Sequence, residues 1–398
     1  MVSSKEQDGQ AGNRVNEDTL MRNRFRGCLV GGAVGDALGA PVEFMRHQEI
    51  IREFGSGGIR DYVPAYGRLG AITDDTQMTL FTAEGMLRAY VRGRMRGLST
   101  FEGVTDHAYQ RWLLTQNRKS RVRDVSRDGW LWPHKDLHHR RAPGLTCLAA
   151  LEAKDKFGQM ATNDSKGCGG VMRVAPVGMF AWHERDREDV LQAYFDVGCD
   201  LAGLTHGHPT GMLTAGVFAV LVLRLLDGSS MEHAVRDAQK TLEAQQSRFE
   251  GHPGVNETGL AVAQAVALAG EFAAKSTDPS VEPGPQPIAQ LGEGWVAEEA
   301  LAITIYCALV AKDFEHGVTL AVNHSGDSDS TGAMTGNLLG AMLGVGAIPE
   351  RWINTLELKD VTESLADDLY DYPSWNIGEY LLGDDNDNRR INERYPGV

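Results

Sequence analysis

The sequence predicts an all-α protein. Apolar residues recur at the three- and four-residue spacing of amphipathic helices along nearly the whole chain, whereas the alternation typical of strands is scarce. The chain has 398 residues, 42% hydrophobic and 23% charged, a balance typical of soluble globular proteins. This length suffices for one large helical domain or two ordinary ones.

Turns and loops divide the helical pattern into separate segments. Residues 1–20 have no apolar core, so we expect a disordered leader and not a secretory signal. A single domain is expected over residues 21–383, with a polar tail at 384–398. The expected helices cover residues 22–38, 75–93, 101–115, 144–157, 187–202, 210–226, 230–248, 256–274, 297–311, 313–322 and 330–345.

Two long connections interrupt the domain. Residues 116–143 are rich in Arg and His and read as a basic loop. Residues 275–296 contain four prolines, which predicts a connector without a helix.

Two of the expected helices carry glycine at every fourth position. Each glycine costs roughly 1 kcal/mol of helix propensity relative to alanine, so the repeat needs a packing reason. Close approach of two helix backbones supplies one, and we expect these helices to lie against each other at the centre of one domain. The repeats are Gly27, Gly31, Gly35 and Gly39, and then Gly332, Gly336, Gly340 and Gly344.

Charge and cysteine usage limit the classes of partner. The net charge of -15 argues against general nucleic-acid binding, which needs a basic face. The five cysteines show no CxxC pair, which indicates reduced thiols and a cytoplasmic protein. The longest apolar stretch, residues 212–226, carries Arg224 and is too short to span a bilayer, so no membrane partner is expected.

Two acidic segments each lead into a predicted helix: Thr73-Asp74-Asp75 and Asp327-Ser328-Asp329-Ser330. Taken singly, each is typical of a helix N-terminus, where side-chain oxygens accept backbone N–H bonds. Taken together, they place four carboxylates near one another, and each close pair repels by about 4 kcal/mol unless protons or cations neutralise it. Such oxygen clusters suit hard cations. We therefore predict a binuclear metal site in a central cleft, with a bridging water as nucleophile.

Other segments have the composition of ligand-binding loops. The glycine-dense turn at Asn163–Gly170 can form an anion nest, although many such turns bind nothing. His206 and His208 are close enough for zinc, but without further Cys or His ligands a hydrogen-bonding or capping role is favoured. Asp36 interrupts an apolar glycine helix, so its carboxylate must be exposed, hydrogen-bonded or near a cation.

Five motifs in order make the chain resemble the ADP-ribosylglycohydrolase family. The resemblance extends from about Arg24 to Ala347, and the ordered set is much more specific than any one motif. The motifs are GDALGAPVE (35–43), TDDTQM (73–78), SKGCGGVMR (165–173), LTH (204–206) and GDSDSTGAMTGNLLGA (326–341).

The resemblance implies a compact all-α domain, an orthogonal helical bundle that binds two Mg²⁺ ions, or Mn²⁺, at the base of a central cleft. Ser330 stands where the family usually has Thr, which keeps the oxygen, and Cys168 where many members have Asn. The implied metal ligands are Thr73, Asp74, Asp75, Asp327, Asp329 and Ser330.

The resemblance further implies hydrolysis at ribose C1″ that releases ADP-ribose from a modified target, ADP-ribosylarginine on protein foremost. Glu43 or an aspartate such as Asp75 or Asp327 would transfer the proton, with Asp164 as a second acid/base candidate. Nearby negative charge would stabilise the cationic transition state. The implied phosphate loop and ribose or phosphate contact are Ser165, Lys166, Gly167, Cys168, Gly169 and His206.

Some interpretations stay open. The basic loop is either a solvated surface or a rim that steers an acidic partner or the ADP moiety. Trp295 either stacks on a base or ribose or serves packing. The alternatives to a housekeeping hydrolase are an immunity-type protein that neutralises a cognate ADP-ribosyltransferase toxin, a non-catalytic ADP-ribose-binding module and another metal-dependent hydrolase such as a phosphatase. The intact acids argue against the binding module.

Overall fold

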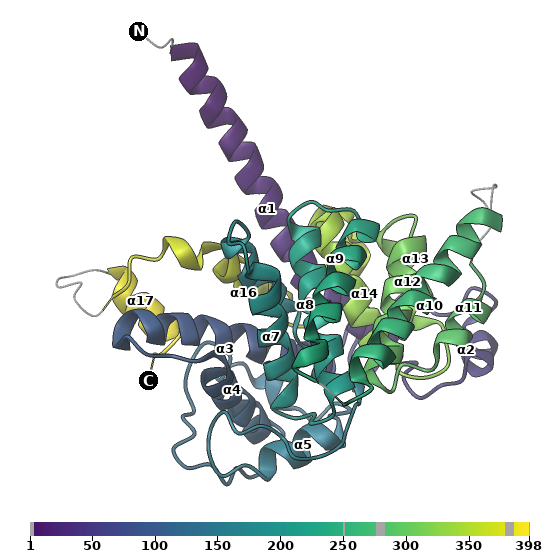
Figure 1. Ribbon diagram of the computed structural model, residues 1–398, viewed down its shortest axis with the longest axis horizontal. Coiled ribbons are helices and arrows are strands. Elements are labelled where there is room, and N and C mark those ends of the chain that lie inside the picture. Colours follow the sequence, from purple (N-terminus) through teal and green to yellow (C-terminus); the bar gives the residue numbers. More distant parts are fainter. Residues whose placement is uncertain (1–3, 250, 276–282, 379–385, 398) are drawn as a thin grey trace.

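The computed structural model describes residues 4–249, 251–275, 283–378 and 386–397. Within these ranges it has helices and no strand, which confirms the all-α prediction (Figure 1). The α-helices are α1 (Ser4–Gly39), α2 (His47–Phe54), α3 (Asp74–Arg96), α4 (Phe101–Thr115), α5 (Leu145–Glu152), α6 (Ala175–Ala181), α7 (Val190–Gly203), α8 (Pro209–Leu226), α9 (Met231–Glu243), α10 (Gly254–Lys275), α11 (Pro285–Leu291), α12 (Ala297–Val310), α13 (Phe314–Val322), α14 (Ser328–Leu343), α15 (Glu350–Ile353), α16 (Lys359–Asp371) and α17 (Asn386–Arg394).

Every helix expected from the sequence has a counterpart, and α4 matches its expected range. Six helices were not expected: α2, α6, α11, α15, α16 and α17. Most of these have nine residues or fewer, too short for a helical period to stand out. In α16 the apolar residues Val361, Leu365 and Leu369 follow a four-residue spacing, but the many acids between them hide it.

Helix α1 begins at Ser4, well before the predicted start at residue 22. Residues 4–20, expected to be a disordered leader, are helical here, and the segment contains no proline that would break the helix. Its N-terminal part projects away from the body of the protein (Figure 1). Where α1 reaches the body, Arg22 and Arg26 form paired hydrogen bonds of 2.7–2.8 Å to Asp371 and Asp367 of α16.

Two segments expected to lack helices contain short ones. In the proline-rich connector, α11 starts at Pro285, which is compatible with the first turn because no intrahelical partner is needed there. The rest of that connector includes residues 276–282, outside the described residues. The polar tail contains α17, whose Ile391 is buried and precedes the fully buried Tyr395. The basic loop contains a single 3-10 turn, Lys135–His138.

The glycine repeats of α1 and α14 face each other, as the sequence predicts. A Cβ at Gly31 would collide with the carbonyl oxygen of Gly336, and a Cβ at Gly336 would collide with that of Gly31. Gly35 and Gly332 show the same reciprocal relationship. No side chain separates the two backbones along these glycines, and an added Cβ on either helix would overlap a carbonyl group of the other.

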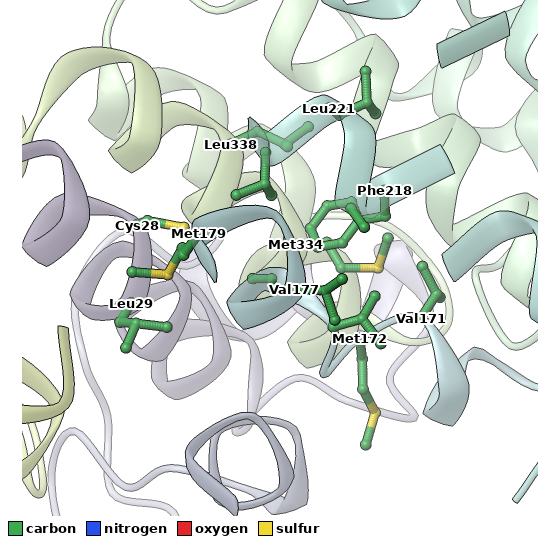
Figure 2. Packing of buried hydrophobic residues seen from close by; sticks show 14 of the residues in the cluster. Cys28, Leu29, Val171, Met172, Val177, Met179, Phe218, Leu221, Met334 and Leu338 are labelled. Atoms are coloured by element: carbon green, nitrogen blue, oxygen red, sulfur yellow. The ribbon is translucent and has the colours of Figure 1, made fainter. Parts of the chain in front are cut away.

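Buried side chains from both ends of the described chain join in one core, which extends from Met21 to Tyr395. The apolar stretch at 212–226 was expected to be too short to span a bilayer, but its helix α8 begins at Pro209 and is long and apolar enough to do so by length and composition. Because 83% of this helix is buried inside the protein, it is a core helix here. Side chains from α1, α6, α8 and α14 pack together in this core (Figure 2). They include Cys28, Leu29, Val177, Met179, Phe218, Leu221, Met334 and Leu338, next to Val171 and Met172.

Candidate active site

A cleft of about 740 Å³ opens where the N-termini of α3 and α14 meet the loop that follows α1. The segment before α5 (residues 140–144) and the glycine-rich loop (residues 163–170) form further walls of this cleft. Residues far apart in the sequence therefore share one cavity. The predicted site residues that line it are Glu43, Asp74, Asp75, Gly167, Cys168, Gly169, His206, Trp295, Asp327, Asp329 and Ser330.

The floor of the cleft is a cluster of carboxylates. One oxygen each of Glu43, Asp327 and Asp329 lie within 4.8 Å of one another, an arrangement that can hold a metal ion. Asp74 and Asp75 of α3 are almost fully buried beside them. The two acidic segments that the sequence singled out thus meet at one place.

Two oxygens of this cluster have no hydrogen-bond donor. Glu43 Oε2 and Asp75 Oδ1 are buried and unpartnered, and an uncompensated carboxylate in that position is costly. Burial, followed by the charges of Asp329 and Asp327, raises the pKa of Glu43 to about 11. Burial and Asp329 likewise raise the pKa of Asp75 and Asp74 well above the usual range. These residues therefore fit a divalent cation, which would supply the missing partner and let the acids ionise.

Asp36 was expected to be exposed, hydrogen-bonded or near a cation, and the structure shows it buried and hydrogen-bonded. Its carboxylate accepts backbone N–H bonds from Thr73 (3.0 Å) and Thr76 (3.1 Å) and the Thr76 hydroxyl. Burial and the charge of Asp329 raise the pKa of Asp36 to about 7. Asp36 thus anchors the start of α3 to α1.

A buried ion pair supports the same segment from its other side. Arg141 of the basic loop pairs with Glu357, and both side chains are almost inaccessible. Arg141 also donates to the Ile72 carbonyl, and Glu357 accepts the Ile72 N–H. The carbonyl of Arg141 accepts the N–H of Asp74. Arg141 is therefore buried inside the protein, and this part of the basic loop is not a solvated surface.

Part of the glycine-rich loop is already hydrogen-bonded within the chain. The Cys168 N–H donates to the Trp295 carbonyl at 3.2 Å, and the Gly167 N–H donates to Ser165 Oγ at 3.4 Å. Neither N–H is therefore free for an anion. The Cys168 thiol donates to Asp327 Oδ2 at 2.7 Å, which brings this loop against the acidic cluster.

His206 is a buried, neutral side chain next to the glycine-rich loop. Its Nδ1 lies 2.8 Å from Thr205 Oγ1, which also accepts from Arg173. Burial and the charge of Arg173 lower the pKa of His206 to about 3. Its ring is so close to Gly169 that a Cβ there would lie 3.1 Å from Cε1. Small residues in the loop are thus needed beside the imidazole.

Four predicted site residues do not line the cleft: Thr73, Asp164, Ser165 and Lys166. Thr73 caps α3 by accepting the Asp75 N–H, and its hydroxyl is 3.5 Å from Asp75 Oδ2. Asp164 is exposed. Lys166 pairs with Glu298 and, at 3.6 Å, with Glu257 on another face. In this structure the Lys166 ammonium is directed to those acids and not to the cleft.

The structure also adds residues that sequence reasoning missed. Phe44 lines the cleft and stacks on Trp295, with ring centroids 5.3 Å apart. Arg140 and residues 142–147 line the wall next to Asp74. Phe44 directly follows Glu43, so its position beside a site acid was the available signal; the 142–147 segment offered none.

The fold and the cleft define an all-α protein with a cluster of buried carboxylates next to a glycine-rich loop. Comparison with known families gives a match to the ADP-ribosylglycohydrolase family over residues 17–377. The chain belongs to this family of hydrolases.

Similar proteins cover most of the chain. A protein of Archaeoglobus fulgidus without an assigned function is 28% identical over 88% of this chain and 97% of its own length. The ADP-ribosyl-[dinitrogen reductase] glycohydrolase of Rhodospirillum rubrum is 26% identical over 85% of this chain and 92% of its own length. The ADP-ribosylarginine hydrolase Tri1 of Pseudomonas putida is 23% identical over 88% of this chain and 78% of its own length. A solved ADP-ribosylglycohydrolase-related protein complex matches with a TM-score of 0.59 and 27% identity, over 88% of this chain and 98% of that chain.

Proposed function

We propose that this protein hydrolyses the glycosidic bond at ribose C1″ that joins ADP-ribose to a modified target, with ADP-ribosylarginine on protein as the main substrate. The observation that carries the proposal is the set of buried carboxylates in the cleft floor, two of whose oxygens have no hydrogen-bond partner. The cleft volume of about 740 Å³ suits a ligand of nucleotide size. The names of the Rhodospirillum and Pseudomonas relatives describe this chemistry for those proteins.

The residues that would hold the metal come from the two acidic segments. We assign two Mg²⁺ ions, or Mn²⁺, to Asp74, Asp75, Asp327, Asp329 and Ser330, with Thr73 as a further oxygen donor at the edge of the cluster. When bound, the ions would supply positive charge that orients the ribose hydroxyls and a water molecule. The donor set supports this assignment because it consists of the carboxylate and hydroxyl oxygens that hard cations prefer.

The protein's own groups carry the remaining chemistry. In the hydrolysis a water oxygen bonds to C1″, the bond from C1″ to the acceptor atom breaks, and one proton passes from the water to the acceptor. We assign the transfer of that proton to Glu43, whose carboxylate lines the cleft next to Asp327 and Asp329. The surrounding aspartates stabilise the positive charge that develops at C1″.

The wider biological setting follows from the same substrate. The partner would be an ADP-ribosylated protein in the cytoplasm, and the reaction would reverse the product of a cognate ADP-ribosyltransferase. The unpaired cysteines support that compartment, since Cys28, Cys147, Cys168, Cys199 and Cys307 are all free.

The test is a product assay. The purified protein with Mg²⁺ is incubated separately with arginine-, serine- and DNA-linked ADP-ribose, and free ADP-ribose is quantified. We expect release from the arginine-linked substrate and a loss of at least a hundredfold in Glu43→Gln, within the range for removing a general acid. The exposed Glu53 of α2 provides the matched control Glu53→Gln. No release from any substrate by the wild-type protein would refute the proposal.

A further inference from the structure

The aromatic pair at the mouth of the cleft is not explained by packing. Phe44 is 68% exposed and Trp295 is 36% exposed, although both are large apolar side chains. Their rings are nearly parallel, with an interplanar angle of 19°. Both residues line the cleft, so the exposed part of each ring is accessible to a ligand there. Two adjacent exposed aromatic rings that line a cleft are typical of a ligand-binding surface.

The backbone that carries this pair is strained at Phe44 and held by hydrogen bonds near Trp295. Phe44 has φ +69°, a left-handed conformation that a bulky residue rarely adopts and that costs about 1–3 kcal/mol. On the other side, Glu299 accepts the N–H groups of Glu293 and Gly294 at 3.0 and 3.1 Å. The carbonyl of Glu293 in turn accepts the Asp327 N–H at 2.8 Å. The segment that carries Trp295 is thus fixed to the acidic cluster before any ligand arrives.

A carboxylate lies at the edge of the indole. Glu293 is exposed, and its Oε2 accepts the Trp295 Nε1–H at 3.2 Å. Aromatic faces next to a carboxylate favour a flat cation, because the ring quadrupole attracts positive charge and the carboxylate pairs with N–H donors. A guanidinium has both properties, being planar, charged and rich in N–H groups.

We propose that Phe44, Trp295 and Glu293 form the acceptor subsite and bind the guanidinium of an ADP-ribosylated arginine. This inference rests on the proposed function. Phe44 directly follows Glu43, so the subsite lies next to the acids at which the bond to the acceptor breaks. An adenine ring is also flat, but it carries no positive charge for Glu293. A serine acceptor has neither a plane nor a charge.

The test compares two acceptors in the same variants. Trp295→Leu and Phe44→Leu remove the rings, Trp295→Phe and Phe44→Tyr keep them, and Glu293→Gln removes the charge. Leu260→Ala is the control for loss of an exposed apolar side chain away from the cleft. The values of kcat/KM for arginine- and serine-linked ADP-ribose, and the inhibition constant of free ADP-ribose, are measured for each variant after a thermal unfolding check.

We expect Trp295→Leu and Phe44→Leu to lower the ratio of arginine to serine kcat/KM about fivefold to tenfold, the size of a partly desolvated cation–π contact. Glu293→Gln should lower the ratio in the same direction, and the ring-keeping variants should restore most of it. Equal losses for both acceptors, together with weaker inhibition by ADP-ribose, would place adenosine on the rings and overturn the inference. A wild-type protein that acts only on the serine-linked substrate would overturn it while leaving the hydrolase activity intact. Inactivity on every substrate would overturn the proposed function itself.

Discussion

The carboxylate of Asp36 in α1 accepts the backbone N–H of Thr73, 37 residues further along the chain, at 3.0 Å. It therefore connects the glycine-lined helix pair to the segment that begins the acidic cluster. Thr76 donates to the same carboxylate twice, through its N–H and its hydroxyl. The placement of Asp74 and Asp75 depends on this buried contact.

The first prediction concerns this anchor. In Asp36→Asn an amide NH₂ would replace an oxygen that accepts N–H donors, so one contact becomes repulsive. With Mg²⁺ present we expect the free energy of unfolding to fall by about 1–3 kcal/mol. The affinity for Mg²⁺ should fall about tenfold or more, as for other groups that orient metal ligands. Chemical denaturation and calorimetric titration measure the two effects, with the exposed Asp155→Asn as the control. Equal values in both variants would argue against an anchoring role.

The second prediction concerns the helix seam. Gly31→Ala should destabilise the protein by about 1–3 kcal/mol, because its Cβ would overlap the Gly336 carbonyl and force the helices apart. The matched control is Gly270→Ala in α10, where an added Cβ has nothing within 4 Å. That substitution should stabilise the protein by about 0.5–1 kcal/mol through helix propensity alone. If denaturation curves gave the same sign for both substitutions, the seam would not be as tight as described.

The third prediction concerns pH and metal removal. Burial and mutual repulsion raise the pKa of Asp36 to about 7 and that of Glu43 to about 11, so the metal-free folded protein retains protons that the unfolded chain loses near pH 4. Their contribution to stability is complete below pH 4 and is lost as the pH rises through 7 and beyond. A bound divalent cation takes the place of these protons. We expect protein stripped of metal by a chelator to have a lower unfolding temperature at pH 8 than at pH 6. Added Mg²⁺ should raise the unfolding temperature more at pH 8 than at pH 6. A gain that is independent of pH would contradict this linkage.

Much of the fold follows from local patterns in the sequence. The four-residue glycine spacing predicted the contact between α1 and α14, because only close backbone approach justifies so many glycines in two helices. The starts of α3 and α14 were equally visible from Thr73 and Asp327 before apolar helices. Short helices such as α2 and α6 were not predicted, because one or two turns contain too few residues to show a helical period.

The site was predictable where its residues stand in motifs, and hidden where they depend on tertiary contacts. Glu43 and Asp329 were named from the sequence, and the structure brings them together. The buried pair of Arg141 with Glu357 spans 216 residues, and no local pattern reports a pairing of that range. The basic character of the loop around Arg141 suggested a surface role, although this arginine is internal. Lys166 was predicted from its motif, but its ammonium group pairs with acids outside the cleft.

The central claim is that the carboxylates of the cleft floor bind divalent metal ions. The most direct measurement is the number of Mn²⁺ ions bound per chain, by calorimetric titration and elemental analysis of protein first stripped by a chelator. We predict two ions for the wild-type protein and a loss of binding in the double variant Asp327→Ala, Asp329→Ala, which removes two of the clustered acids but leaves the glycine seam of α14 unchanged. No bound metal in a folded wild-type protein, or the same two ions in the double variant, would contradict the account.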